Sequence, residues 1–409
     1  MEPETRIFLI VEEFPYPPYH GGRIDVWNRI KAFKKMGVKV FLLSWYGLKK
    51  NESVSETDIS VVRDSVEHLV LLPIRRDFRR ILSLVRYPSL VGARIIGRAK
   101  YQAILKQVVD FSPSLIFLDG IYCGLTGLMF ERDLKLPMSI RLHNVEHKYM
   151  HGQSLLENKA RNKVSIFLAL LHLKSYEEKI IFGVDTFFNI SLVDLEYYTN
   201  KGYKYGQWLP PFLIDKENSF GSAKGNSGAQ YNVGYFGNLY APNNIAGIIW
   251  FVTSVLPIIK SQIPNFTVLL VGSNPSTEIM NFLKAHENIT VIPNPKTVDE
   301  FISSVDIIIN PVHFGSGVNI KSIESLFSDR QVVSTSTGIS GLPHKVFETF
   351  FIADTSFEFA DTIIKILKGD LEKNIVSRQG TRLLFDGSIL KEMLPLMLIK
   401  RNRSGDKEY

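Results

Sequence analysis

Two glycines, a serine, a lysine and a glutamate stand close together in the second half of the chain. Gly315, Ser316 and Gly317 separate a strand-like run from a helix-like segment that carries Lys321 and Glu324. The first turn of a helix presents unpaired backbone N–H groups and the positive end of the helix dipole, and glycines let such a backbone approach a phosphate. The spacing therefore favours an anion-binding loop.

The lysine and the glutamate suit different parts of one ligand. Three residues separate Lys321 from Glu324, so a helix places both on the same face. Lysine suits a phosphate, whereas a carboxylate repels phosphate and accepts hydrogen bonds from the paired hydroxyls of a ribose or sugar. Together they indicate a nucleoside-diphosphate sugar. The alternative is an ordinary capped helix with an exposed Lys321–Glu324 ion pair, and the spacing leaves both open.

Apolar runs of strand length alternate with amphipathic stretches along the 409 residues. Several runs lack polar alternation, which is typical of strands buried on both faces of a parallel sheet. The repeated β-α units predict an α/β fold with two Rossmann-like, doubly wound domains facing a cleft. The predicted strands are residues 6–11, 38–44, 68–72, 115–118, 138–142, 186–190, 233–236, 267–271, 289–292, 306–310 and 331–335, and the clearest helices are 26–35 and 244–260.

A break between domains is predicted near the middle of the chain. A Leu-Pro-Pro turn at 209–211 precedes a glycine- and serine-rich stretch at 220–229, which is typical of a flexible surface loop. We expect a first domain over 1–208 and a second over 209–385. Residues 386–409 are expected to form a helix that packs back on the first domain and ends in a frayed tail.

Composition limits the classes of function. The net charge of +7 favours an anionic partner, and the one cysteine, Cys123, excludes an internal disulfide. The acidic N-terminus predicts no signal peptide, and no apolar run reaches the ~18 residues of a membrane span. The longest apolar run, residues 164–171, predicts a buried helix. These features suit a soluble protein of a reducing cytoplasm.

Arginines are mixed with apolar residues between residues 75 and 88, and more basic residues follow up to Lys100. This composition is typical of a surface that rests on anionic lipid, with apolar side chains in the headgroup layer. A solvated basic helix, or a patch that grips an anionic acceptor, explains the same residues. Nucleic acid is not an expected partner, because no recognition module accompanies the charge.

Five segments together resemble the GT-B fold retaining glycosyltransferases, specifically the large glycosyltransferase family 4. They are FPYPPYHGG at 14–22, RLHNVEH at 141–147, YFGNLYAPNN at 235–244, LLVG at 269–272, and the loop and helix at 311–327. Their order and spacing, over roughly residues 6–345, carry the resemblance. It implies that the first domain binds the acceptor and the second binds the nucleotide-sugar donor.

The resemblance also assigns roles to particular residues. His143, at the end of a strand, contacts the transferred sugar through its imidazole or its backbone carbonyl. Lys321 neutralises the departing phosphate and Glu324 holds the ribose, so these three are the expected catalytic residues. The expected donor-binding residues are Gly21, Gly22, Asn238, Gly315, Ser316, Gly317 and Val318.

Two features depart from the family pattern. Many members carry two glutamates eight positions apart, and Ser316 stands where the first would fall, with Glu324 as the second. The arginine and lysine that often grip the diphosphate are replaced by asparagines within 238–244. Lys321 is therefore expected to take over the cationic role.

The sequence leaves two roles open for each of three more residues. Arg23, beside the Gly-Gly turn, either reaches phosphate or lies on the surface. Glu146 and His147 either accept a hydrogen bond from the acceptor hydroxyl or cap a helix.

The function predicted is transfer of a sugar, with retention, to a hydroxyl of a glycan or lipid-linked acceptor in bacterial surface polysaccharide synthesis. A non-hydrolysing nucleotide-sugar epimerase shares the fold but needs carboxylate acid–base residues, of which Glu146 and Glu324 are the obvious ones. A non-catalytic sugar-nucleotide or glycan-binding protein is the third possibility, because Ser316 replaces a glutamate. No cofactor or metal is expected, since the sequence has no His/Cys cluster and no Asp-x-Asp pair. The expected location is cytoplasmic, peripheral on the inner face of the cell membrane, and the oligomeric state is left open.

Overall fold

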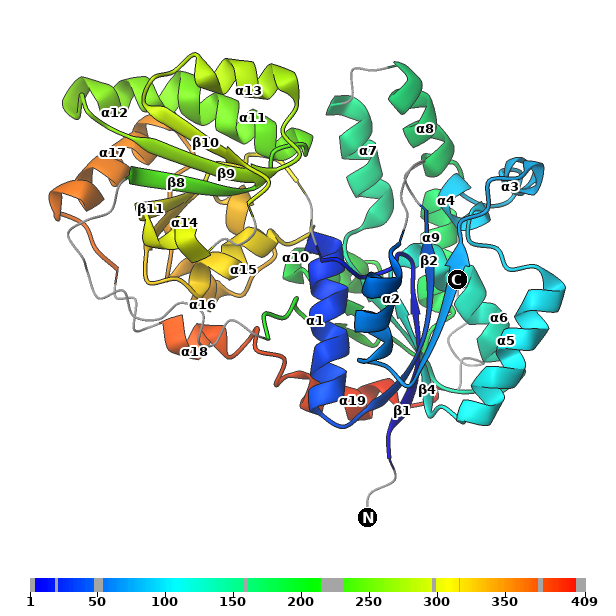
Figure 1. Cartoon of the computed structure of the whole chain (residues 1–409). Helices are drawn as coiled ribbons and strands as arrows, with labels where there is room; N and C mark the ends of the chain where they lie inside the picture. The colour runs from blue at the N-terminus through cyan, green and yellow to red at the C-terminus, as the bar shows by residue number, and fades with distance from the viewer. Residues whose placement is uncertain are drawn as a thin grey trace. The chain divides into compact units, whose positions relative to one another are not determined.

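The structure is a computed structural model that describes residues 4–18, 21–47, 54–156, 160–214, 231–295, 299–315, 317–373 and 378–401. The chain forms two compact units, which we call unit 1 (Met1–Ile214 with Gly387–Tyr409) and unit 2 (Asp215–Asp386). Each unit holds one parallel sheet with helices on both faces (Figure 1). The prediction of two doubly wound α/β domains is confirmed, whereas the glycine- and serine-rich stretch at 220–229 lies outside the described residues.

The sheet of unit 1 has seven strands in the order β3-β2-β1-β4-β5-β6-β7. All neighbouring pairs are parallel, and β1 lies between β2 and β4. The six predicted strands of this half are present, and β7 is an additional strand of three residues, too short to leave a hydrophobic pattern. The strands are β1 (Arg6–Val11), β2 (Lys39–Tyr46), β3 (His68–Pro73), β4 (Leu115–Asp119), β5 (Met138–Leu142), β6 (Thr186–Asn189) and β7 (Gly206–Trp208).

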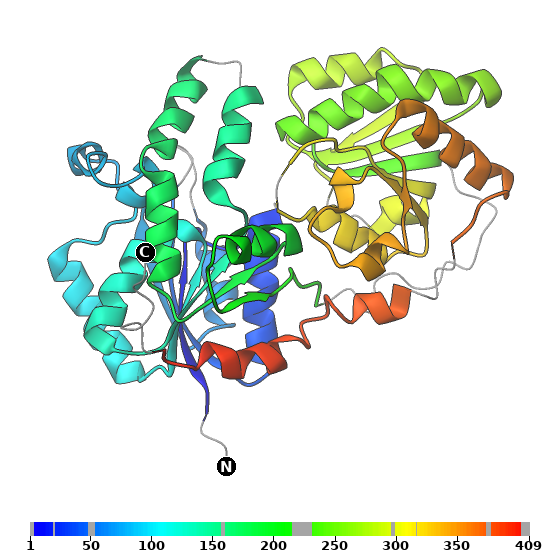
Figure 2. The ribbon, with the colours of Figure 1, turned by 180° about the vertical axis from the view of Figure 1, so that it is seen from behind.

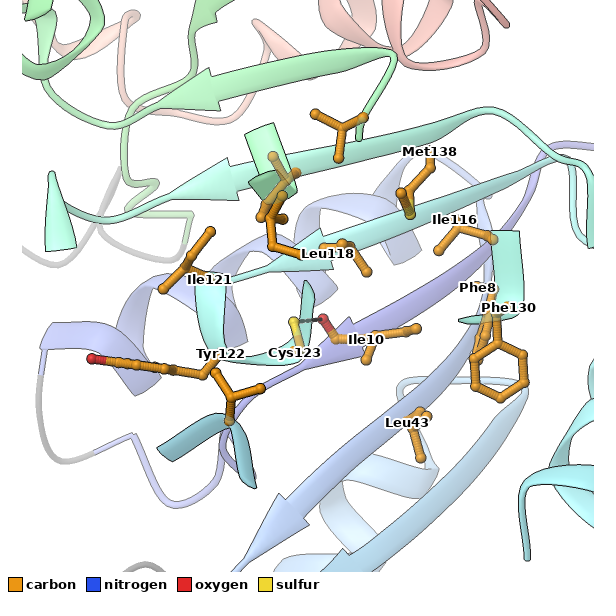
Figure 3. Close-up of a cluster of buried hydrophobic side chains, with 14 of the residues drawn as sticks. Phe8, Ile10, Leu43, Ile116, Leu118, Ile121, Tyr122, Cys123, Phe130 and Met138 are labelled. Atoms are coloured by element: carbon orange, nitrogen blue, oxygen red, sulfur yellow. Dashed lines mark hydrogen bonds between the residues drawn. The ribbon is translucent and has the colours of Figure 1, made fainter. Parts of the chain in front are cut away.

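Side chains of β1 alternate between two apolar layers. Phe8 and Ile10 pack on one face of the sheet, as Figure 3 shows, beside Ile116 and Leu118 of β4. Helices α5, α6 and α9 pack on that layer, and α1, α2 and α19 pack on the other face. The described helices of unit 1 are α1 (Gly21–Lys35), α2 (Glu56–Arg63), α3 (Phe78–Ser83), α4 (Ser89–Gly92), α5 (Arg98–Phe111), α6 (Gly124–Leu134), α7 (Glu146–Leu156), α8 (Ala160–Leu170), α9 (Leu173–Phe182), α10 (Leu192–Asn200) and α19 (Leu390–Met397).

Helix α8 contradicts one prediction. The apolar run at 164–171 was expected to be a buried helix, but Val164 is 59% exposed and Phe167 61% exposed. The reason is packing: α8 lies against the helices α4, α7 and α9, and Ala169 is its buried residue. The α7–α8 hairpin thus presents apolar side chains outward, and Figure 2 shows it from behind.

The sheet of unit 2 has six strands in the order β10-β9-β8-β11-β12-β13. The five predicted strands are present, and the two-residue β13 was not predicted. The strands are β8 (Tyr231–Asn238), β9 (Val268–Ser273), β10 (Ile289–Pro293), β11 (Val305–Asn310), β12 (Gln331–Ser334) and β13 (Phe351–Ile352). The described helices are α11 (Pro242–Trp250), α12 (Leu256–Gln262), α13 (Thr277–Lys284), α14 (Asp299–Ser303), α15 (Ile320–Leu326), α16 (His344–Phe347), α17 (Ser356–Lys368) and α18 (Arg378–Arg382).

Helices α11 and α12 join through a π-helical stretch, Phe251–Val255, into one long helix. By length and composition, Pro242–Gln262 is apolar enough to cross a membrane, so the expectation that no apolar stretch reaches that length is wrong. Phe251, Val255 and Ile259 are each 0% exposed and belong to the core of unit 2. The helix Pro242–Gln262 is therefore apolar in part because one face of it packs into the core of unit 2, and 44% of its apolar window is buried.

Candidate functional site

Both sheets place predicted site residues beyond the carboxyl ends of parallel strands. In unit 1 the strand order reverses between β1 and β4, and in unit 2 between β8 and β11. Loops leave a sheet in opposite directions at such a reversal, and ligands of doubly wound folds bind there. Glu12 and Asp119 stand at the reversal of unit 1, and Asn238 and the loop after Asn310 stand at that of unit 2.

Five titratable side chains, four of them buried and one partly buried, form a group in unit 1, which we call the charged network. They are Asp25 and Arg29 of α1, Asp119 of β4, Arg141 of β5, and His143. Arg141 donates to both carboxylate oxygens of Asp25. Arg29 forms ion pairs with Asp25 and Asp119. Since Asp25 and Arg29 are four residues apart, α1 turns both toward the sheet.

His143 follows β5, as predicted, and lies between the two carboxylates. Its Nε2 is 2.7 Å from Asp119 Oδ1, and its Nδ1 is 3.7 Å from Asp25 Oδ2. Burial lowers the pKa of His143, but the hydrogen bond and charge of Asp119, with the charge of Asp25, outweigh burial and raise it. Burial raises the pKa of Asp119, yet Arg29 and His143 hold it well below its usual range.

Two further carboxyl groups, those of Glu12 and Glu146, are joined through Tyr122. The Tyr122 hydroxyl donates to Glu146 Oε1 (2.9 Å), and the Tyr122 backbone N–H donates to Glu12 Oε2 (3.2 Å). Burial raises the pKa of Glu12. Burial, with the negative charge of Glu12, raises the pKa of Glu146 to about 7. Glu146 therefore changes charge near neutral pH.

Gly120 makes room for the Glu12 carboxylate. Its φ of +100° lies in the region that favours glycine, and a Cβ at this position would stand 2.3 Å from Glu12 Oε2. The Asp119-Gly120 pair at the end of β4 thus supplies the partner of His143 and the space for Glu12.

Glu177 of α9 caps the N-terminus of α7. It is fully buried and accepts hydrogen bonds from the backbone N–H groups of Glu146 (2.8 Å) and His147 (3.4 Å). Its second oxygen is 2.5 Å from His147 Nδ1, and the Tyr198 hydroxyl donates to the first (2.7 Å). A carboxylate at this end of a helix satisfies orphan donors and complements the dipole. Glu177, which the sequence analysis did not consider, is therefore the capping residue.

Helix α1 begins at Gly21, five residues earlier than predicted. Gly21 and Gly22 therefore form the first turn of this helix, where backbone N–H groups lack partners within the helix. Arg23 is 4% exposed and donates to Glu13 Oε1 from Nε (2.9 Å) and Nη2 (2.6 Å). The interpretation of Arg23 as a surface residue is therefore wrong.

Lys321 of unit 2 lies in the first turn of α15 and is 9% exposed. Its Nζ donates to the Tyr235 hydroxyl (2.9 Å) and to Asn244 Oδ1 (2.8 Å). Burial lowers the pKa of Lys321 to about 7, against the opposing effect of Glu324. The alternative of an exposed Lys321–Glu324 ion pair is wrong, because Lys321 is buried and Glu324 partly buried.

Asn238 and Asn244 shape the turn between β8 and α11. Asn238 Oδ1 accepts from the backbone N–H groups of Tyr240 (2.6 Å) and Ala241 (3.2 Å). Asn244 Nδ2 donates to the backbone oxygen of Asn238 (2.8 Å), while its Oδ1 receives Lys321. The asparagines that stand where the family often has cations therefore position the lysine.

The predicted phosphate-binding loop connects β11 to α15. Gly317 has φ +72°, a conformation that favours glycine. Val318 directly follows Gly317, and Gly315 lies two residues before it. Ser316 lies outside the described residues. Lys321, Asn238 and this loop thus come from the reversal point of one sheet, whereas His143 belongs to unit 1.

Sequence reasoning missed Glu12, Asp25, Arg29, Asp119 and Tyr235 as members of these groups. A signal existed for two of them, because Glu12 and Asp119 come at the polar end of a buried strand. Asp25 and Arg29 offered a weaker signal, a charged pair four residues apart within an otherwise buried helix face. Among the described residues, no group of three or more His, Cys, Asp or Glu side chains is arranged to hold a metal ion.

Comparison with known protein families finds a match in unit 2. Residues 230–369 match the sequence profile of the family described as "Glycosyl transferases group 1". A relative from Klebsiella pneumoniae, described as an "uncharacterized 44.6 kDa protein in cps region", is 25% identical over 379 residues, covering 89% of this chain and 91% of the relative.

Solved structures with a similar fold cover nearly the whole chain. A glycosyltransferase from Rickettsia africae ESF-5 aligns with a TM-score of 0.66 at 14% identity, over 98% of this chain and all of the other. Anabaena Alr3699/HepE in complex with UDP aligns at 0.62 and 11% identity, over 96% and 99%. A mutant of S. aureus TarM, in complex with Fondaparinux, alpha-GlcNAc-glycerol and UDP, aligns at 0.64 and 10%, over 96% and 99%. The chain has the two-sheet GT-B fold of these structures, and its residues 230–369 match the group 1 glycosyltransferase family.

Proposed function

We propose that this protein transfers a sugar from a nucleoside-diphosphate sugar to a hydroxyl of a glycan or lipid-linked acceptor. The observation that carries the proposal is Lys321, which is buried at the reversal point of the unit 2 sheet and oriented by Tyr235 and Asn244. Both described hydrogen-bond partners of this buried amine are neutral. An anion that binds beside the amine therefore stabilises its charged form.

The donor diphosphate is proposed to bind at the 315–318 loop, with Lys321 opposing the charge that builds on the leaving group and Glu324 holding the ribose. Gly21 and Gly22 are proposed to contribute backbone N–H groups from the first turn of α1. UDP is the first nucleotide to test, because the similar structures of HepE and TarM were determined with UDP.

The acceptor side of the proposal rests on a second comparison. The relative from the cps region supports a role in surface polysaccharide synthesis. Retention of the anomeric configuration and independence from metal ions follow from the family resemblance and are part of the proposal. Proton NMR of the product made from an α-linked donor tests retention directly, since an α-linked product is expected and a β-linked product contradicts it.

Contact with an anionic membrane is the last part of the proposal. Exposed apolar side chains gather on α3 and the segment after it, and on the α7–α8 hairpin. Helix α4 packs against both α3 and α8, and Figure 1 shows these helices on the same side of unit 1. Exposed basic residues accompany them on both elements. The apolar residues are Phe78, Ile81, Leu82, Val85, Leu155, Val164 and Phe167, and the basic residues are Arg79, Arg86, Arg161 and Lys163. Such a surface suits the headgroup layer of the inner face of a cell membrane.

Vesicle sedimentation tests the membrane contact. Replacing Phe78 and Phe167 by serine should reduce binding to vesicles that contain an anionic lipid. Phe357 of unit 2 is 69% exposed, so Phe357→Ser is the matched control. Equal binding of the double variant and the control would remove the membrane from the proposal.

Thermal unfolding with UDP, GDP, dTDP and ADP tests the donor site. A ligand that binds the folded state alone raises the unfolding temperature. One nucleotide should raise it in the wild type and in Glu348→Gln, a variant at an exposed glutamate, and raise it less in Glu324→Gln. The nucleotide that binds identifies the nucleotide-sugar to use next. Assays with that nucleotide-sugar then distinguish sugar transfer, epimerisation and binding without turnover. If none of the four shifts the wild type, the donor proposal is contradicted.

A further inference from the structure

The charged network of unit 1 contributes little to the stability of the fold. Asp25, Arg29, Asp119 and Arg141 are each at most 1% exposed. Removing such ions from water costs about as much free energy as their pairing returns, so apolar residues of similar volume stabilise a core at least as well. The network therefore points to another task. The member that keeps contact with solvent is His143, whose side chain is 21% exposed.

The contacts of Asp119 determine where one proton of His143 stands. One oxygen of this carboxylate pairs with Arg29, and the other is 2.7 Å from His143 Nε2. A carboxylate paired with a guanidinium is ionised and can only accept hydrogen bonds. The hydrogen of this contact therefore belongs to Nε2, and Asp119 fixes the orientation of the ring.

The contact of Asp25 concerns the second ring nitrogen. Asp25 Oδ2 is 3.7 Å from His143 Nδ1. In a neutral ring with its hydrogen on Nε2, the lone pair of Nδ1 would face this anion and be repelled by it. An imidazolium turns an N–H toward the anion instead. Both ring nitrogens therefore favour the same, protonated state.

The remaining charges near His143 do not reverse this preference. Arg29 and Arg141 oppose a third cation, but each is already paired with a carboxylate of the network. Glu12 and Glu146 favour the cation whenever they are ionised, and burial raises the pKa of both. The groups that face His143 come from α1, β4, β5, the end of β1 and the start of α7, and they are Asp25, Arg29, Asp119, Arg141, Glu12 and Glu146.

We propose that Asp119 and Asp25 hold the His143 side chain as an imidazolium, which makes it a fixed cation and not a proton acceptor. Asp119 and Asp25 are then positioning residues. This inference rests on the proposed function and deepens it. The ligand group that this cation favours is an electron-rich oxygen, such as a phosphate or sugar oxygen, and the proton of the acceptor hydroxyl leaves to a different group.

The protonation state can be read directly by NMR without any ligand. Long-range ¹H–¹⁵N spectra of protein labelled at its nine histidines distinguish an imidazolium from either neutral tautomer. His143→Gln identifies the signal, and the exposed His344 provides a reference. We expect both nitrogens of His143 to be protonated at pH 7, because the hydrogen bond and charge of Asp119 and the charge of Asp25 raise its pKa above the ordinary value.

A variant of the positioning residue extends the test. Asp119→Asn keeps an acceptor for Nε2 but removes the negative charge, so the midpoint of the His143 titration should fall by about one pH unit or more. Asp133→Asn is the control, because Asp133 pairs with Tyr101 and Arg132. If Asp119→Asn does not fold, the titration of the wild type decides alone.

Two results would overturn the inference: a neutral His143 in the wild type at pH 7, or an unchanged titration in folded Asp119→Asn. Neither depends on a donor. Failure of every nucleotide to shift thermal unfolding would instead contradict the proposed function and leave the protonation state of His143 as measured.

Discussion

Binding of a nucleoside diphosphate should weaken as pH rises above 7, and Lys321 is the reason. Its pKa of about 7 in the free protein means that half of the molecules carry the ammonium at that pH. A diphosphate holds the lysine protonated, so the apparent dissociation constant scales inversely with the protonated fraction. With the pKa at about 7, this fraction is roughly 0.9 at pH 6, roughly 0.1 at pH 8 and roughly 0.01 at pH 9.

The dissociation constant of UDP should therefore rise about tenfold from pH 6 to pH 8 and about fiftyfold from pH 7 to pH 9. Isothermal titration in two buffers of different ionisation enthalpy should also show uptake of about half a proton per UDP at pH 7. Lys321→Met should bind UDP at least about tenfold more weakly at pH 6 and lose the pH dependence. Lys345→Met, at an exposed lysine of unit 2, should keep it.

The same titration acts on stability with the opposite sign. The pKa of Lys321 falls from its ordinary 10.5 to about 7 on folding, so the unfolded chain binds more protons between these values. The free energy of unfolding should therefore gain from this group as pH rises through that window, while UDP affinity falls. A flat UDP affinity from pH 6 to pH 9, with Lys321→Met still weakened, would refute the argument from burial. A flat affinity with an unweakened variant would remove Lys321 from the site.

Three other predictions use the groups in unit 1 and the expected absence of a metal. Gly120→Ala should lower the free energy of unfolding by about 1–3 kcal/mol, because φ is positive there and the added Cβ meets Glu12. Gly97→Ala is the control, since Gly97 has open space around it, and it should lower the free energy of unfolding far less in the same thermal unfolding experiment. Because folding raises the pKa of Glu146 from 4.5 to about 7, the folded state binds more protons in that window and stability falls as pH rises. Glu146→Gln should therefore be more stable than the wild type at pH 8, by up to about 3 kcal/mol, and this difference in the free energy of unfolding should shrink toward pH 5. An equal difference at both pH values would contradict the pKa argument. Glu348→Gln is the control. Transfer activity should survive EDTA, and its loss, with recovery on added metal, would contradict a metal-independent reaction.

Much of the fold could be predicted because both sheets are parallel and buried. Strands covered on two faces give uninterrupted apolar runs, and all eleven predicted strands correspond to strands of the structure. The missed strands, β7 and β13, have three and two residues and carry no such run. The error at 164–171 has the same origin, because an apolar run alone does not tell whether a helix meets a sheet or extends from it.

The candidate sites were predictable where a loop motif marks them and less so elsewhere. The glycines near residue 315 and the lysine after them are a local pattern, so the sequence pointed to Lys321. Its burial and its partners Tyr235 and Asn244 are separated from it by 86 and 77 residues and depend on the packing of three elements. The partners of His143 are likewise distant, and pairing across strands cannot be seen in a single sequence.

The route of the chain has a consequence for how the protein is made. Unit 2 is one continuous segment inserted into unit 1, and the piece Gly387–Tyr409 of unit 1 is translated after unit 2. Leu390 and Met397 of that piece are 0% exposed in the core of unit 1. Burying each contributes roughly 1.5–3 kcal/mol. On the ribosome, unit 2 can therefore complete its core before unit 1 does, although unit 1 begins first. A chain that ends early, after Asp386, would lose stability in the unit farthest from the cut in sequence.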